Sequence, residues 1–192
     1  MRHILTFAFM AALASSACGN SNPSGPTGGT GTLNMRLTDS PFSDAKAVLI
    51  TFSEVSAHRE DADWAKVPFA DAAATGRTCD LKKLEGPIDI LGSGPLTAGH
   101  YTQIRLVVAS ATIYFENASA DGPACATTIA APAGRSANLD IPSGEVKLNR
   151  GFDLAADGAT TIVLDFDGDK SIHETGNGRF MMSPVIGVKS VQ

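Results

Sequence analysis

The chain has 192 residues, a formal net charge of −5 and 43% hydrophobic residues. This length allows one ordinary domain with a sizeable core, and the apolar content excludes a wholly disordered chain. The acidic balance and the lack of a basic stripe argue against a nucleic-acid partner, and no glycine-rich phosphate-binding motif follows a predicted strand, so no nucleotide is expected.

The first residues have the pattern of an export signal. Met1–His3 is a short basic start, Ile4–Leu13 is an apolar run, and small residues then precede Cys18. The apolar run is too short to cross a bilayer of about 30 Å. The pattern resembles a lipoprotein signal peptide over residues 1–17, in which Cys18 receives a diacylglycerol and becomes the new N-terminus.

Two further observations bear on Cys18. Lipoprotein signals favour Leu at the place of Ser15, so ordinary secretion with cleavage upstream of Cys18 stays an alternative. The chain has three cysteines, an odd number for an exported protein. If Cys18 carries lipid, Cys79 and Cys125 remain as a pair that an oxidising compartment would join. We therefore expect a lipid on Cys18 and a disulfide between Cys79 and Cys125.

Residues 18–31 are rich in Gly, Ser, Pro and Asn, with little to bury. This composition predicts a flexible tether with a reach of roughly 20 Å. Gly19 directly after the cysteine resembles lipoproteins that are sorted to an outer membrane. The expected location is therefore the cell envelope, with the chain anchored by lipid on the outer membrane of a cell that has two membranes.

The folded domain is expected to span residues 32–192. An alternating first strand ends at Asp39, where the polar and proline-containing sequence breaks the pattern. Ala47–Arg59 predicts a long strand whose apolar phase slips at Ser53-Glu54, which indicates a β-bulge. Trp64–Phe69 is expected to pair back against this strand as a short hairpin partner.

The middle of the chain contains its least and its most regular stretches. Residues 70–94 are irregular, with a short helical turn or packed loop expected near residues 80–92. Thr102–Phe115 is the strongest strand pattern in the chain. It is preceded by Leu-x-x-Gly-x-Tyr, which fits a tyrosine corner at Tyr101, where the hydroxyl bonds back to the backbone. An ordinary buried tyrosine at a strand start is the alternative.

Later strands complete an all-β pattern. Short strands are expected at Cys125–Ala131, Ala137–Ile141 and Val146–Leu154. Thr160–Val188 predicts two strands joined by an acidic connection, with turns at Gly168 and at 176–178. Strands at this spacing without a long amphipathic helix predict a single Greek-key β-sandwich of the immunoglobulin or transthyretin-like type.

Four segments carry a resemblance to a known family: LTDSPFSDAKAVLITFSEVSAHRE, LTAGHYTQIRLVV, IPSGEVKL and LDFDGDKSIHETGNGRFMMSPVIGV. In this order they resemble the bacterial lipoprotein family catalogued as domain of unknown function 4382, over roughly Thr32 to Val188. The resemblance implies an exported, usually lipid-anchored β-sandwich similar to transthyretin-like and carboxypeptidase-regulatory-like modules, and it implies no activity. The family's acid–aromatic–acid stretch is matched by Asp165-Phe166-Asp167.

This acidic stretch is also a candidate metal site. Asp165 and Asp167 share one face of a strand, and Asp169 follows after a glycine. Several carboxylates near one turn suit Ca²⁺, which prefers oxygen ligands, although the spacing does not continue as a helix–loop–helix calcium motif. The sequence therefore predicts an irregular Ca²⁺ site on Asp165, Asp167 and Asp169. The alternative is a solvated strand end with Lys170 or Arg179 as a loose partner, which protects a sheet edge.

No pattern of catalytic residues is evident. His58, His100 and His173 have no metal-ligand spacing, and no nucleophile elbow is present. We therefore expect no enzyme and no cofactor beyond the Ca²⁺ considered above. The favoured function is a structural or protein-binding module with an envelope protein as partner. A calcium-dependent, carbohydrate-binding or small-ligand-binding module is the alternative, and a hydrolase is least favoured.

Overall fold

The structure is a computed structural model that describes residues 28–40, 44–60 and 62–192. The signal peptide, Cys18 and most of the predicted tether lie outside these residues. The described elements are β1 (Thr30–Ser40), β2 (Ala47–Arg59), β3 (Trp64–Lys66), β4 (Arg77–Asp80), η1 (Leu81–Leu84), β5 (Asp89–Thr97), β6 (Gly99–Tyr114), β7 (Cys125–Ala126), β8 (Ser136–Asp140), β9 (Glu145–Leu148), β10 (Phe152–Leu154), β11 (Ala159–Asp167), α1 (Gly168–Ser171), β12 (Ile172–Gly176), β13 (Arg179–Met182) and β14 (Ile186–Val191).

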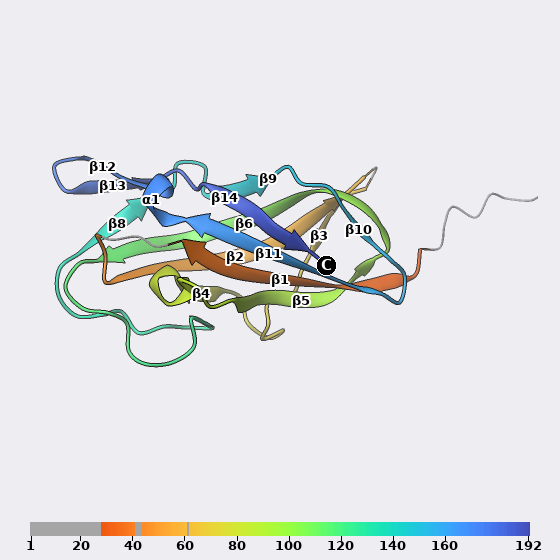
Figure 1. The fold of residues 1–192 in the computed structure, drawn as a ribbon, viewed down its shortest axis with the longest axis horizontal. Helices are drawn as coiled ribbons and strands as arrows, with labels where there is room; N and C mark the ends of the chain where they lie inside the picture. The colour runs from red at the N-terminus through yellow and green to blue at the C-terminus, as the bar shows by residue number, and fades with distance from the viewer. Residues whose placement is uncertain (1–27, 41–43, 61) are drawn as a thin grey trace, which may run out of the picture.

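The described strands form two sheets that pack as a sandwich. The smaller sheet has the strand order β14-β11-β1-β5, and its central strands β1 and β11 run parallel. The larger sheet has the order β12-β13-β8-β6-β2-β4-β7, with β3 beside β2 and with β9 and β10 beside β6. Figure 1 shows the smaller sheet lying over the long strands β2 and β6. The predicted all-β sandwich is therefore confirmed.

The core lies between the two sheets because alternate residues of each strand point inward. On β1, the side chains of Leu33, Met35 and Leu37 are all 0% exposed. Across the sandwich, the ring of Phe52 on β2 lies 6.5 Å from the ring of Phe166 on β11. This burial is the main favourable contribution to folding, since each large apolar side chain contributes about 1.5–3 kcal/mol.

The predicted bulge in β2 is confirmed. Phe52 is paired with Val108 and Glu54 with Val107, so the register passes over Ser53. One extra residue shifts the inward phase of the strand, and apolar residues on both sides of Ser53 can therefore face the core. The predicted pairing of the following segment is confirmed as well, because β3 pairs with the end of β2.

The irregular stretch predicted for residues 70–94 is shorter than expected. Its helical turn is present as η1, but residues 89–97 form strand β5 beside β1. Two glycines of β5 pack closely against Pro68. A Cβ atom on Gly92 would lie 2.6 Å from the carbonyl oxygen of Pro68, and one on Gly94 would lie 2.6 Å from the ring of Pro68.

Three predicted strands have different limits in the structure. Cys125–Ala131 is a strand only as β7, and Val146–Leu154 is split into β9 and β10, which both pair with β6. The last predicted strand is split into β13, which pairs with β12 and β8, and β14, which pairs with β11. The break includes Pro184, which has no N–H to donate to a ladder.

Candidate functional site

Tyr101 is hydrogen-bonded across the turn between β5 and β6. Its side chain is 0% exposed, and its hydroxyl donates a 2.8 Å hydrogen bond to the carbonyl oxygen of Thr97. The turn contains Gly99 at a φ of 147°, a conformation that favours glycine. The ring of Tyr101 stacks on Phe152 at 5.1 Å between centroids. Burial raises the pKa of the hydroxyl, which keeps it a donor. The bond back to the upstream backbone is the feature expected of a tyrosine corner.

Replacing Tyr101 by phenylalanine should lower the free energy of unfolding by about 1 kcal/mol, because the ring packing is kept and one buried hydrogen bond is lost. Urea unfolding of both proteins measures the difference. An unchanged midpoint would show that the carbonyl group of Thr97 finds another donor.

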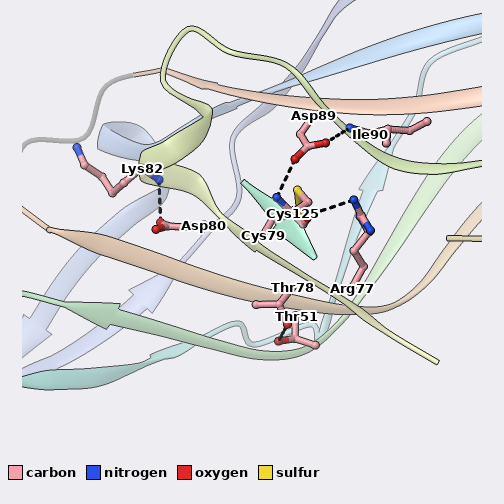
Figure 2. The surroundings of a disulfide bond; sticks show 9 residues. All are labelled: Thr51, Arg77, Thr78, Cys79, Asp80, Lys82, Asp89, Ile90 and Cys125. Carbon is pink, nitrogen blue, oxygen red and sulfur yellow. Dashed lines mark hydrogen bonds between the residues drawn. A yellow bond between two sulfur atoms is a disulfide. The ribbon is translucent and has the colours of Figure 1, made fainter. Parts of the chain in front are cut away.

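The disulfide joins two short strands at the edge of the larger sheet. Cys79 of β4 and Cys125 of β7 are direct register partners, and their sulfur atoms are bonded at 2.06 Å. The side chains are 0% and 2% exposed. Polar groups hold the backbone around them: Arg77 Nη2 donates to the carbonyl oxygen of Cys125 at 3.0 Å, and the Cys125 N–H donates to Asp89 Oδ2 at 2.8 Å. Figure 2 shows both contacts converging on Cys125.

Asp80 organises the same region. Its side chain is 1% exposed, and Oδ1 accepts hydrogen bonds from the backbone N–H groups of Val48 and Lys82, both at 3.1 Å. Oδ2 accepts a 2.5 Å hydrogen bond from the hydroxyl of Ser119. One buried carboxylate therefore caps η1, fixes the start of β2 and holds the segment that leads to Cys125.

The predicted calcium ligands are placed at the end of β11 and in α1. Asp167 caps α1 by accepting from the backbone N–H of Lys170 at 3.2 Å and from its Nζ at 2.5 Å. The hydrogen bond between the two side chains lowers the pKa of Asp167 and raises the pKa of Lys170. Asp165 accepts from the hydroxyl of Ser40 at 3.5 Å, and Asp169 is exposed.

These three carboxylates are not brought together as a metal site. Within residues 28–40, 44–60 and 62–192, no group of three or more His, Cys, Asp or Glu side chains is arranged to hold a metal ion. The pairing of Asp167 with Lys170 instead fits the alternative interpretation, in which the acidic stretch is a solvated strand end with a basic partner.

Asp39 is a residue that the sequence interpretation missed. The inward alternation through Met35 and Leu37 continues to Asp39, which is 5% exposed. Both of its carboxylate oxygens are buried without a hydrogen-bond partner. Burial raises the pKa of Asp39 to about 8, and the negative charges of Glu85 and Asp165 act in the same direction. The inward phase of the strand places Asp39 in the core, although Asp39-Ser40-Pro41 has the composition of a strand end.

The outer face of the larger sheet carries a network of charged side chains. Glu54 accepts from Lys66 at 2.7 Å and from Arg105 at 2.8 Å. The Arg105 guanidinium also lies 4.3 Å above the ring of Trp64. The hydrogen bond from Lys66 lowers the pKa of Glu54. The charged side chains of this network form ion pairs with one another, as is usual for cross-strand pairs on a solvated sheet face.

The three histidines of the domain have local partners or lie exposed. His58 Nδ1 is 3.1 Å from the hydroxyl of Thr102, and His100 Nδ1 is 2.7 Å from Asp153 Oδ1. His173 lies exposed on β12. Each histidine is thus placed on a different strand, with a local partner or with solvent.

A shallow groove of about 310 Å³ follows the middle of β6, between β8 and the turn before β9. Its lining includes Ser110, Thr112, Asn138 and Asp140 and no aromatic side chain. A sugar-binding surface usually offers an exposed ring, and the single tryptophan, Trp64, lies beneath Arg105 instead.

Comparison with known proteins identifies the family. The family model described as domain of unknown function (DUF4382) matches residues 30–184, which include every strand from β1 to β13. The chain belongs to the DUF4382 family. Searches of curated proteins and of solved structures gave no match for this DUF4382 protein. The part of the chain that the structure describes contains no helix long and apolar enough to span a bilayer.

Proposed function

We propose that this DUF4382 protein is an exported, lipid-anchored module of the bacterial cell envelope with a structural or protein-binding role and no catalytic activity. The observation that carries the proposal is the buried Cys79–Cys125 disulfide, which fits folding in an oxidising compartment. This pairing leaves Cys18 as the odd cysteine, directly after the signal-like residues 1–17.

Lipid chemistry supports anchoring at Cys18. A thioether-linked diacylglycerol and an N-acyl chain together place more than one acyl chain in the bilayer. One chain binds a membrane only marginally, whereas two or more give stable attachment. Residues 19–28 would then separate the membrane from β1, where Ala98 N–H donates to the carbonyl oxygen of Gly29 at 2.7 Å and ties the start of the fold to the β5–β6 turn.

The side-chain arrangement supports a non-enzymatic role. The charged groups of Glu54, Lys66 and Arg105 are engaged with one another, and His100 is paired with Asp153. These contacts stabilise a sheet surface and do not pair a nucleophile with a base. A folded surface held near a membrane by a tether suits a protein partner in the envelope, and Gly19 favours the outer membrane as its location.

Replacing Cys18 by serine tests the anchor. Cell fractionation should find the wild-type protein with the membranes and the Cys18→Ser protein in the soluble fraction. A Ser24→Ala variant is the matched control, because it changes the tether and keeps the cysteine. If wild type and Cys18→Ser are equally soluble, the protein is not lipid-anchored.

The partner role has a separate test. Affinity purification from detergent-solubilised envelope membranes should recover a second protein in fixed proportion to this one. Retention on a glycan array without a protein partner would favour the carbohydrate-binding alternative and would contradict the proposed role.

A further inference from the structure

The buried carboxyl of Asp39 has no use in the proposed anchoring or binding role. The residue lies at the end of β1 and is 5% exposed, and neither carboxylate oxygen has a partner at hydrogen-bond geometry. The nearby backbone N–H of Ser40 lowers the pKa of Asp39, but burial raises it more. Leaving a buried carboxylate unpaired is costly, and a protein usually avoids this by keeping the group protonated. The packing around Asp39 therefore depends on whether its carboxyl group carries a proton.

The charges around Asp39 come from two neighbouring elements and are mostly negative. Glu85, directly after η1, forms a parallel β-bridge with Asp39, and Asp165 lies on the adjacent strand β11. The nearby cation is Lys82 of η1, which is ion-paired with Glu85. Ionisation of Asp39 would therefore add a third carboxylate charge beside one lysine.

Residues 86–88, directly after Glu85, are the exposed part of this cluster. Gly86 and Pro87 are exposed, and the side chain of Ile88 is 46% exposed. Besides the bridge between Glu85 and Asp39, the hydroxyl of Thr38 on β1 donates to the carbonyl oxygens of Leu84 at 3.1 Å and Pro87 at 2.9 Å. By contrast, Asp165 lies on a strand paired on both sides.

We propose that Asp39 is a pH-sensitive switch, in which the protonated side chain lets residues 85–88 pack against the end of β1 and the ionised side chain releases them. Charge repulsion from Glu85 and hydration of the new carboxylate favour the released form. This inference concerns the folded domain alone and does not depend on lipidation of Cys18.

The direction of the effect follows from proton linkage. Burial raises the pKa of Asp39 from 3.8 to about 8 in the folded protein. The closed form therefore holds a proton that the unfolded or released form gives up above pH 4. Closure is strongest below about pH 4, weakens as the pH rises towards 8, and changes no further above that value.

Hydrogen exchange of the backbone amides near residues 85–90, measured from pH 5 to pH 9, tests the switch. Relative to amides in the centres of β2 and β6, exchange of this segment should accelerate by up to about tenfold per pH unit and level off near pH 8. In Asp39→Asn this extra acceleration should be absent. Asp169→Asn is the matched control, because it removes an exposed acid near the same end of the sandwich and should behave as wild type.

Two results would overturn the proposal. One is a wild-type segment whose exchange follows that of the core strands at every pH, and the other is an Asp39→Asn protein that keeps the wild-type acceleration. If Asp39→Asn does not fold, carbon NMR titration of the Asp39 carboxyl in the wild type decides the question. A midpoint near 8 supports the switch, and a midpoint near 4 contradicts it.

Discussion

Replacing both Cys79 and Cys125 by alanine should lower the free energy of unfolding by about 4 kcal/mol. The disulfide closes a loop with a sequence separation of 46, and cutting it enlarges the conformational freedom of the unfolded chain. The variant also loses two buried side chains from the core. Since a domain of this size has a total stability of about 5–15 kcal/mol, this loss is a large share of it.

Urea unfolding of wild type, of wild type with a reductant, and of the double variant measures the effect. Both changes should move the midpoint to lower urea, and the double variant should move at least as far because it also loses two buried side chains. Cys18→Ala is the control, since residue 18 lies outside the described fold, and its midpoint should equal that of the wild type. A double variant within about 1 kcal/mol of wild type would show that the bond adds little to stability.

Replacing Asp80 by alanine should lower the free energy of unfolding by about 3 kcal/mol, because three donors lose a buried, charged acceptor at once. The donors are the N–H groups of Val48 and Lys82 and the hydroxyl of Ser119. The same change removes the cap of η1. Ser119→Ala should cost about 1 kcal/mol, since it removes a single bond of this set.

Asp71→Ala is the matched control for Asp80. Asp71 is also an aspartate that accepts from a nearby backbone N–H, that of Ala73 at 3.1 Å, but it is exposed. Its loss should change stability by well under 1 kcal/mol. Equal losses in Asp80→Ala and Asp71→Ala would contradict the view that the buried carboxylate organises this region.

Features that depend on neighbours in the sequence could be predicted. The two-residue alternation in β1, β2 and β6 locates their inward faces, and the slip at Ser53 reports the bulge directly. The pairing of Cys79 with Cys125 could be inferred from the number of cysteines, and the Tyr101 hydrogen bond spans only four residues. Each of these features depends on residues close in sequence or on the number of cysteines, so it can be found without a three-dimensional structure.

Features that depend on distant segments could not be predicted. The parallel pairing of β1 with β11 joins Thr32 to Ala159, and no pattern within either strand specifies its partner. Pro184 marks a break in the last predicted strand, but the sequence does not show that β13 and β14 on its two sides join different sheets. The sheet that each strand joins is therefore decided by tertiary pairing and not by the local pattern.

The candidate sites follow the same division. Asp165, Asp167 and Asp169 are adjacent in sequence, but Asp167 is taken by Lys170 in the cap of α1. The acids that do influence one another, Asp39, Glu85 and Asp165, come from three separate segments. Charge density along the chain therefore does not show which carboxylates lie close together in the fold.

Mass spectrometry of the protein purified from cell envelopes, digested without reduction, tests the central claim most directly. The proposed function predicts an N-terminal peptide that begins at Cys18 and carries acyl chains, together with a disulfide-linked pair of peptides containing Cys79 and Cys125. An N-terminal peptide with an unmodified Cys18, together with free thiols at Cys79 and Cys125, would contradict it.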